Sequence, residues 1–225
     1  MSGRSGGDGR ARAVLWDLDG TLVDTEPYWI KAEFALVGRH GDRWSLEQAH
    51  ALVGNDLLTS ARVLQRHGGV RLPAEQIVQA LLDDVTAEVR REVPWRPGAR
   101  ELLVKLRAAG VPCGLVTMSY ADLAGAVVEH LPPNSFDVVV TGDMVDNGKP
   151  HPEPYLSAAR LLGVAPADCV AIEDSLTGVA SATAAGMRVL AVPHLVPVPA
   201  APGRTVTHTL AGLGAANLLA VGTAG

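Results

Sequence analysis

From residue 97 onward, short and almost continuously apolar runs alternate with segments of helical periodicity. Strands that are buried on both faces appear as continuous apolar runs, and strands separated by helices form parallel sheets with right-handed crossovers. The pattern predicts an α/β protein with a doubly wound parallel sheet. We expect strands at 14–17, 111–117, 136–141, 169–173 and 188–192, and helices at 98–109, 122–131, 152–162, 175–185 and 210–220.

A helical stretch separates the first strand from the others. Pro27 and Pro73 suit helix starts, and Ser45 with Gln48 forms a capping-box pattern. We expect residues 25–96 to form an inserted helical cap on a core made of 13–24 and 97–225, with the two connections side by side. A cap of this size is near the lower limit for independent folding, so it should lean on the core. The expected cap helices are 27–38, 45–53, 57–67 and 73–91.

Composition excludes several classes of protein. The net charge of −5 and the lack of a basic block argue against a nucleic-acid partner. No apolar run reaches the roughly 18 residues of a membrane-spanning helix. Residues 1–12 are rich in Gly, Ser and Arg and predict a disordered tail rather than a secretion signal. Cys113 and Cys169 fall on predicted buried strands, which favours reduced thiols and a cytoplasmic location. The oligomeric state, monomer or homodimer, stays open.

Polar clusters follow the predicted strands. Because the carboxyl ends of parallel strands share one edge of a sheet, where ligands bind, we expect these clusters to converge. Helical caps and turns explain any one of them, but not four at one edge. The clusters are Asp17 with Asp19, Thr117-Met118-Ser119, Gly148-Lys149-Pro150, and Glu173-Asp174-Ser175.

The acidic residues of these clusters predict a cation site. Two carboxylates as close as Asp17 and Asp19 are costly beside a buried strand unless a cation or a proton lies between them. Alternatively, Asp19 and Gly20 form an ordinary turn. Glu173 and Asp174 add oxygen ligands of the kind that Mg²⁺ prefers. The alternative for this cluster is a cap for the next helix.

The remaining polar groups predict an anion site. The hydroxyls of Thr117 and Ser119 and the backbone N–H groups that follow could hold an anion at a helix N-terminus. Alternatively, Ser119 caps that helix. Lys149 lies in a proline-restricted loop and could bind a phosphoryl oxygen or Asp17. A lone lysine is otherwise usually a solvated charge.

The segment Asp-x-Asp-Gly-Thr-Leu-Val-Asp, residues 17–24, resembles the first motif of the haloacid dehalogenase superfamily of phosphotransferases. Thr117 resembles the second motif, Lys149 the third, and Glu173 with Asp174 the fourth. The resemblance covers residues 13–192 and is closest to the subgroup of β-phosphoglucomutase and small phosphatases, which have a Rossmann-like core and an α-helical cap. Met118 departs from the Asn or small residue of relatives, so its backbone N–H is the expected contact.

The resemblance implies a Mg²⁺-dependent phosphatase for a small phosphomonoester, such as a sugar phosphate-like metabolite. Asp17 would form an aspartyl-phosphate, and Asp19 would act as general acid and base. Asp17, the backbone carbonyl of Asp19, Glu173 and Asp174 would hold the metal, and residues 117–119 and Lys149 the phosphate. Alternatives are a phosphomutase of the β-phosphoglucomutase type, a non-catalytic phosphosugar-binding regulator and, less favoured, a dehalogenase.

Recognition of the leaving group is expected in the cap, because the polar residues of the core are committed to phosphate and metal. Gly54, Asn55 and Asp56 lie between two predicted cap helices and could face the core as a turn. Alternatively, Asn55 or Asp56 caps the next helix.

Overall fold

The structure is a computed structural model and describes residues 11–53 and 56–222. Its centre is one sheet of six parallel strands in the order β3-β2-β1-β4-β5-β6. Strand order therefore reverses around β1, as in Rossmann-like folds. The strands are β1 (Ala13–Trp16), β2 (Cys113–Val116), β3 (Val138–Val140), β4 (Cys169–Glu173), β5 (Arg188–Ala191) and β6 (Arg204–Val206).

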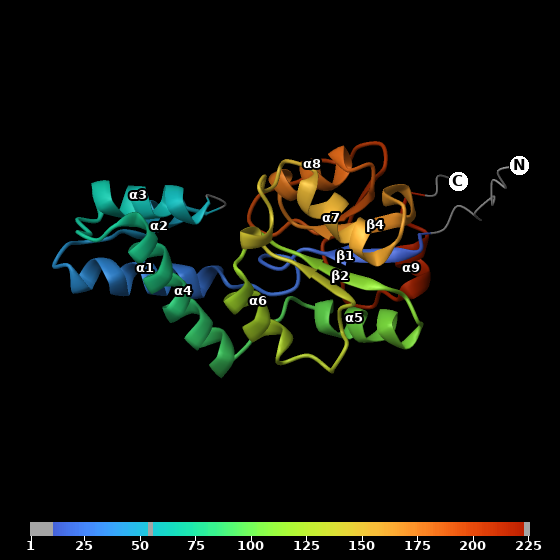
Figure 1. Cartoon of the computed structure of the whole chain (residues 1–225), viewed down its shortest axis with the longest axis horizontal. Helices are drawn as coiled ribbons and strands as arrows, with labels where there is room; N and C mark the ends of the chain where they lie inside the picture. Colours follow the sequence, from blue (N-terminus) through green and yellow to red (C-terminus); the bar gives the residue numbers. More distant parts are fainter. Residues whose placement is uncertain (1–10, 54–55, 223–225) are drawn as a thin grey trace, which may run out of the picture.

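Helices cover both faces of the sheet, as Figure 1 shows. Successive side chains of β1 point to opposite faces of the sheet, since side chains alternate along a strand. Val14 and Trp16 belong to the apolar cluster beside α5 and α6, and Ala13 and Leu15 to the cluster beside α7 and α8. The core helices are α5 (Ala99–Ala108), α6 (Ala121–Val128), α7 (Glu153–Leu162), α8 (Leu176–Ala184) and α9 (Ala215–Leu219), with short 3₁₀ turns at Gly142–Met144 and Pro166–Asp168.

The segment between β1 and α5 forms a separate helical lobe, at the left of Figure 1. The α4 helix packs on α1 and α3 and also on α6 of the core. Leu64 and Leu81 of this lobe share one apolar cluster with Leu123 of the core. The lobe therefore leans on the core, as expected for an insertion of this size. Its helices are α1 (Glu26–Arg39), α2 (Leu46–His50), α3 (Leu57–His67) and α4 (Ala74–Arg91).

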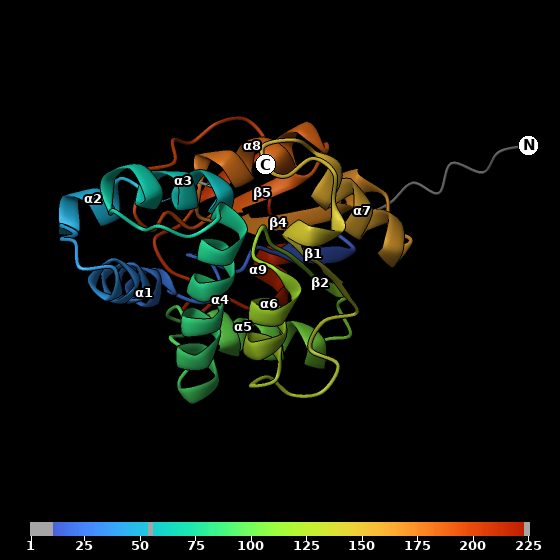
Figure 2. The same cartoon turned by 60° about the vertical axis from the view of Figure 1, so that its left-hand side comes forward.

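Two adjacent chain segments connect the lobes. Val23 and Trp95 form an antiparallel bridge. The Asp24 N–H donates to the Pro94 carbonyl at 2.8 Å, and the Arg96 N–H donates to the Leu22 carbonyl at 3.0 Å. The prediction of side-by-side connections is thus confirmed. The strands point toward the cap, so their carboxyl ends face it (Figures 1 and 2).

Several local predictions need correction. The region 193–207, where the sequence predicted neither a strand nor a helix, contains β6, which pairs in parallel with β5. The predicted closing helix at 210–220 is only α9, because Gly212 adopts φ +81° and interrupts the helical backbone. Most of the predicted tail, residues 1–10, lies outside the described residues. Ala11, placed in that tail, is buried and donates its N–H to the Leu219 carbonyl at 3.0 Å.

Two other local predictions, the capping box of α2 and the free, buried cysteines, are confirmed. Ser45 and Gln48 form the capping box of α2. Cys113 and Cys169 are both buried and free. Among the described residues, no helix combines the length and the apolarity that crossing a membrane would require.

Candidate active site

The turn after β1 brings two acidic residues together across a glycine. Asp17 continues the sheet, with its N–H donating to the Ile172 carbonyl of β4 at 3.0 Å. Gly20 then turns the chain at φ +83°. A Cβ at Gly20 would lie 2.2 Å from Asp174 Oδ2, so any other residue would displace this carboxylate. The glycine therefore sets the close approach of the first motif to Asp174.

Lys149 is a buried cation at the centre of the site. Its Nζ donates to Asp17 Oδ1 at 2.7 Å, to Glu173 Oε1 at 2.6 Å and to the Val116 carbonyl at 3.0 Å. Burial alone would lower the pKa of Lys149, but the two carboxylates outweigh it and hold the pKa above its usual range. The sequence suggested that Lys149 binds either a phosphoryl oxygen or Asp17, and in the structure it binds Asp17.

Glu173 is fully buried and has a partner for each oxygen. Oε1 accepts from Lys149 and from the Tyr155 hydroxyl at 2.8 Å, and Oε2 accepts from the Ser175 hydroxyl at 3.2 Å. A Cβ on Gly178 would lie 1.9 Å from Oε1, so α8 can pass this close only at a glycine. Glu173 therefore orients Lys149. Tyr155 was missed by the sequence analysis, because an aromatic residue on a helix gives no local sign of a distant partner.

Three carboxylates gather beside Lys149. Asp17, Glu173 and Asp174 offer oxygens that all lie within 4.8 Å of one another. Burial raises the pKa of Asp17 to about 7, and Glu173 adds to the rise while Lys149 opposes it. Burial, followed by Asp17 and Glu173, raises the pKa of Asp174 to about 8. One lysine does not balance three ionised carboxylates, so without a further cation the cluster binds protons more readily than isolated carboxylates do.

A small divalent cation would fit this cluster. Asp17 Oδ2 is buried and has no hydrogen-bond partner among the described residues. A buried carboxylate oxygen needs a donor, a proton or a cation. Carboxylate oxygens in this number suit Mg²⁺, which also keeps water or substrate oxygens as ligands. Asp17 and Asp174 could hold the ion directly, whereas Glu173 is already engaged by three hydrogen-bond donors.

The Asp19 side chain faces a set of hydroxyls. Its Oδ1 accepts from the Thr25 hydroxyl at 2.5 Å, and its Oδ2 accepts from the Ser119 hydroxyl at 2.6 Å. Asp19 is only partly buried and lies outside the three-carboxylate cluster. Hydroxyl groups thus hold both oxygens of Asp19 away from the metal cluster. Proton transfer by this side chain and a metal contact through the Asp19 backbone carbonyl stay predictions. Thr25 was missed, although it directly follows the acidic motif.

The segment 117–119 connects the ends of β1 and β2. The Thr117 hydroxyl accepts the Ser119 N–H at 2.9 Å. The proposed capping role of Ser119 is wrong, because α6 begins after Tyr120 and has no side-chain cap. The Met118 sulfur accepts the Lys149 N–H at 3.2 Å. The side chain that departs from the family pattern thus supports the lysine loop, and a phosphate contact by the Met118 N–H stays a prediction.

In the cluster Glu173-Asp174-Ser175, one residue caps a helix and the acidic residues still belong to the carboxylate cluster. The Ser175 hydroxyl accepts the Gly178 N–H at 3.0 Å and so caps α8. This cap leaves the neighbouring Asp174 carboxylate free to contribute to the metal cluster.

Of the three cap residues predicted to recognise the leaving group, the structure describes only Asp56. Gly54 and Asn55 lie outside the described residues. Asp56 is exposed and caps α3, accepting the Thr59 N–H at 2.9 Å and the Thr59 hydroxyl at 2.6 Å. These hydrogen bonds lower the pKa of Asp56. The capping alternative is confirmed for Asp56, and substrate recognition by this turn stays a prediction.

Glu26, at the start of α1, was also missed. It is half-buried, and burial, followed by Asp19 and Asp24, raises its pKa to about 7. It therefore brings a second titratable carboxyl group close to Asp19 from the cap side. In the sequence, only its position immediately after Thr25, next to the acidic motif, could have indicated a role for Glu26 near the site.

Comparison with known proteins identifies the family. Residues 14–192 match the haloacid dehalogenase-like hydrolase family. Hexitol phosphatase A of Escherichia coli K12 is 36% identical over 184 residues, covering 81% of this chain and 83% of that protein. Fructose-1-phosphate phosphatase YqaB of the same strain is 32% identical, covering 79% of this chain and 94% of its own.

Solved structures agree with the observed architecture. The crystal structure of CbbY from Rhodobacter sphaeroides in complex with phosphate has a TM-score of 0.83 and 30% identity, and the match covers 92% of this chain and 99% of CbbY. The family match spans every strand from β1 to β5 together with the cap. The chain therefore belongs to the haloacid dehalogenase-like hydrolase family, and it is one of the phosphatases of that family.

Proposed function

We propose that the protein hydrolyses a small phosphomonoester, of the sugar phosphate or sugar alcohol phosphate class, in a Mg²⁺-dependent reaction through an aspartyl-phosphate. The observation that carries the proposal is the buried Asp17 Oδ2 beside Lys149 and Asp174, for which the described part of the chain supplies no hydrogen-bond donor. The substrate class is suggested by the relatives named as hexitol and fructose-1-phosphate phosphatases.

Asp17 is the proposed nucleophile. Its carboxylate attacks phosphorus while the leaving alkoxide departs, and water later attacks the aspartyl-phosphate to release inorganic phosphate. The attack requires the ionised carboxylate, and Lys149 favours ionisation by donating to Oδ1 at 2.7 Å. A bound Mg²⁺ would neutralise charge on the carboxylates and the phosphoryl oxygens.

Asp19 is the proposed general acid and base. It protonates the leaving oxygen in the first step and removes a proton from water in the second. The hydroxyls of Thr25 and Ser119 hold its carboxylate in place. Lys149, Thr117 and the Met118 N–H are the proposed phosphate contacts. The cap turn with Gly54, Asn55 and Asp56 is the proposed site of leaving-group recognition.

Residues 25–96 are proposed to act as a cap that closes over the carboxyl ends of the strands and excludes bulk water. Glu26 lies on the cap side of Asp19 and is a candidate for contact with substrate hydroxyls. A cytoplasmic location remains our expectation from the two free, buried cysteines.

Phosphate release from a panel of phosphorylated sugars and sugar alcohols tests the proposal. We expect turnover with Mg²⁺ and none in excess chelator. Full activity in chelator would contradict the metal role. A phosphomutase would instead isomerise the substrate and depend on a sugar bisphosphate activator, and a non-catalytic regulator would bind phosphosugars without any turnover.

A further inference from the structure

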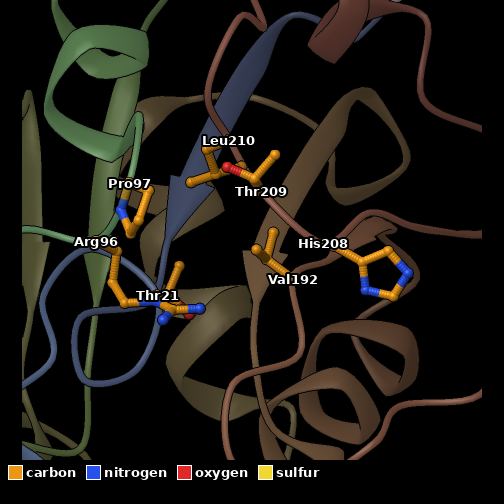
Figure 3. A pocket seen from close by; sticks show the side chains of 7 residues that line it. All are labelled: Thr21, Arg96, Pro97, Val192, His208, Thr209 and Leu210. Atoms are coloured by element: carbon orange, nitrogen blue, oxygen red, sulfur yellow. The ribbon is translucent and has the colours of Figure 1, made fainter.

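A cavity lies beside Thr21 of the first motif, where the core meets the connection to the cap (Figure 3). Its volume is about 140 Å³. Buried residues form its floor, and Pro97, His208 and Thr209 are exposed at its mouth. The lining comes from Thr21, Arg96, Pro97, Val192, His208, Thr209 and Leu210.

Two buried polar atoms at this cavity have no hydrogen-bond partner in residues 11–53 and 56–222. Thr21 is 0% exposed, and its hydroxyl has no hydrogen-bond partner among the described residues. Arg96 Nε is likewise buried and unpaired within the described part of the chain. A buried guanidinium nitrogen without an acceptor costs folding free energy. We therefore expect an acceptor from solvent to bind in the cavity.

The charge of the lining indicates the kind of acceptor. Arg96 brings a permanent positive charge, and no residue of the lining is acidic. Figure 3 shows Arg96 and Thr21 on one side of the cavity and His208 on the other, with its ring directed away from them. The volume suits a small oxyanion and is too small for a nucleotide or a coenzyme.

We propose that this cavity binds a tetrahedral oxyanion of the size of inorganic phosphate or sulfate, held by the Arg96 guanidinium and the Thr21 hydroxyl. The site joins parts of the chain that are far apart in sequence. Thr21 belongs to the first motif, Arg96 to the return from the cap, and Leu210 to the segment after β6. Gly98, at φ +81°, fixes this junction, because a Cβ there would lie 2.2 Å from the Ala211 nitrogen.

Occupation of the site should stabilise the connection between cap and core. The Arg96 backbone N–H already donates to the Leu22 carbonyl within that connection. An anion on the Arg96 side chain would add a second link to the first motif through Thr21. This inference concerns binding and is independent of the proposed phosphatase reaction.

Binding of inorganic phosphate and of sulfate, measured by calorimetry and thermal melting in excess chelator at constant ionic strength, tests the proposal. In the absence of metal, the carboxylate cluster of the active site should repel anions, so binding there is suppressed. We expect both anions to raise the melting temperature relative to chloride. A response to phosphate alone would restrict the site to phosphate, and no response to either anion would overturn the proposal.

Variants locate the binding. Arg96→Gln should weaken anion binding roughly tenfold or more, because a charge-assisted hydrogen bond is lost. Arg100→Gln is the matched control, since Arg100 is exposed and stacks on Trp95 outside the cavity, and it should bind as the parent does. Equal binding by the two variants would overturn the proposal.

A crystallographic measurement keeps the test decisive if Arg96→Gln does not fold. Crystals of the unmodified protein soaked in selenate should show an anomalous peak within hydrogen-bond distance of Arg96 Nε and Thr21 Oγ1. Thr21→Val, which removes only the hydroxyl donor, should reduce the occupancy of that peak. A cavity that holds only water under these conditions contradicts the proposal.

Discussion

Asp17 and Asp56 are the same amino acid in opposite circumstances. The partner of Asp17 is Lys149, which is 132 residues away in the chain, whereas Asp56 is satisfied by Thr59, only three residues away. Burial raises the pKa of Asp17 to about 7, while the hydrogen bonds from Thr59 lower the pKa of Asp56. A carboxylate that the fold leaves partly unsatisfied is available for metal and substrate, and one that caps a helix is already engaged. Four predictions test this contrast.

The largest expected effect is that of Asp17→Asn. Removal of the nucleophile should lower kcat by roughly 10⁴-fold or more. In chelator the melting temperature should stay the same or rise, because the substitution removes a charge from a crowded, buried cluster. Steady-state kinetics and thermal melts check both parts.

Asp56→Asn is the matched control for this experiment. The chemical change is the same, and Asn is as good a helix cap as Asp, so activity and stability should both stay near the parent values. Activity of Asp17→Asn close to that of this control would refute the nucleophile assignment.

Gly178→Ala should be the next most disruptive substitution. The new Cβ would lie 1.9 Å from Glu173 Oε1, so the carboxylate that orients Lys149 must move. Overpacking of this kind costs about 1–3 kcal/mol of folding free energy, and kcat should fall with it. Denaturant unfolding and kinetics measure the two effects.

Gly125→Ala provides the comparison, because Gly125 also lies in a helix, α6, and a Cβ there would meet no atom of the described residues within 4 Å. That change should stabilise the protein by about 0.5–1 kcal/mol. If the two alanine variants have the same stability and activity, Glu173 does not hold Lys149 in the way described.

The pH dependence of stability should reveal the raised pKa values of the buried carboxylates. The pKa values of Asp17 and Asp174 are raised from 3.8 to about 7 and about 8, so the metal-free folded state binds more protons than the unfolded chain. Its stability should therefore fall as the pH rises from about 4 to 8. Mg²⁺ competes with these protons, so its stabilising effect should grow over the upper half of that range.

Melting temperatures across this pH range, with Mg²⁺ and with chelator, provide the measurement. Asp17→Asn should flatten the metal-free slope and reduce the effect of Mg²⁺. A stabilisation by Mg²⁺ that is independent of pH would mean that these carboxylates are not its ligands.

The smallest expected effect is that of Asp56→Ala. Loss of the α3 cap should cost about 1 kcal/mol of stability. If the turn at 54–56 also reads the leaving group, the ranking of kcat/KM among phosphoesters should change in Asp56→Ala but not in Asp56→Asn. A uniform fall in kcat/KM for all substrates would limit Asp56 to its capping role.

The local patterns of the sequence were sufficient for the architecture. Continuous apolar runs marked five of the six strands, and Ser45 with Gln48 marked a helix start. The strand β6 was missed, because Arg204–Val206 is short and only partly buried and so lacks an apolar run. The closing helix was predicted too long, because helical periodicity does not report the left-handed conformation of Gly212.

The sequence by itself determined which residues meet at the edge of the sheet. Parallel strands must end at one edge, so placing Asp17, Thr117, Lys149 and Glu173 after strands was enough to bring them together. Only the tertiary structure decided how they pair. Glu173 is held by Lys149 and Tyr155, and Asp19 by Thr25 and Ser119. Asp17 retains one oxygen that no described residue contacts by a hydrogen bond. Apart from the Asp19–Thr25 hydrogen bond, these contacts join segments that are remote in sequence, and their geometry depends on helix packing that no local pattern encodes.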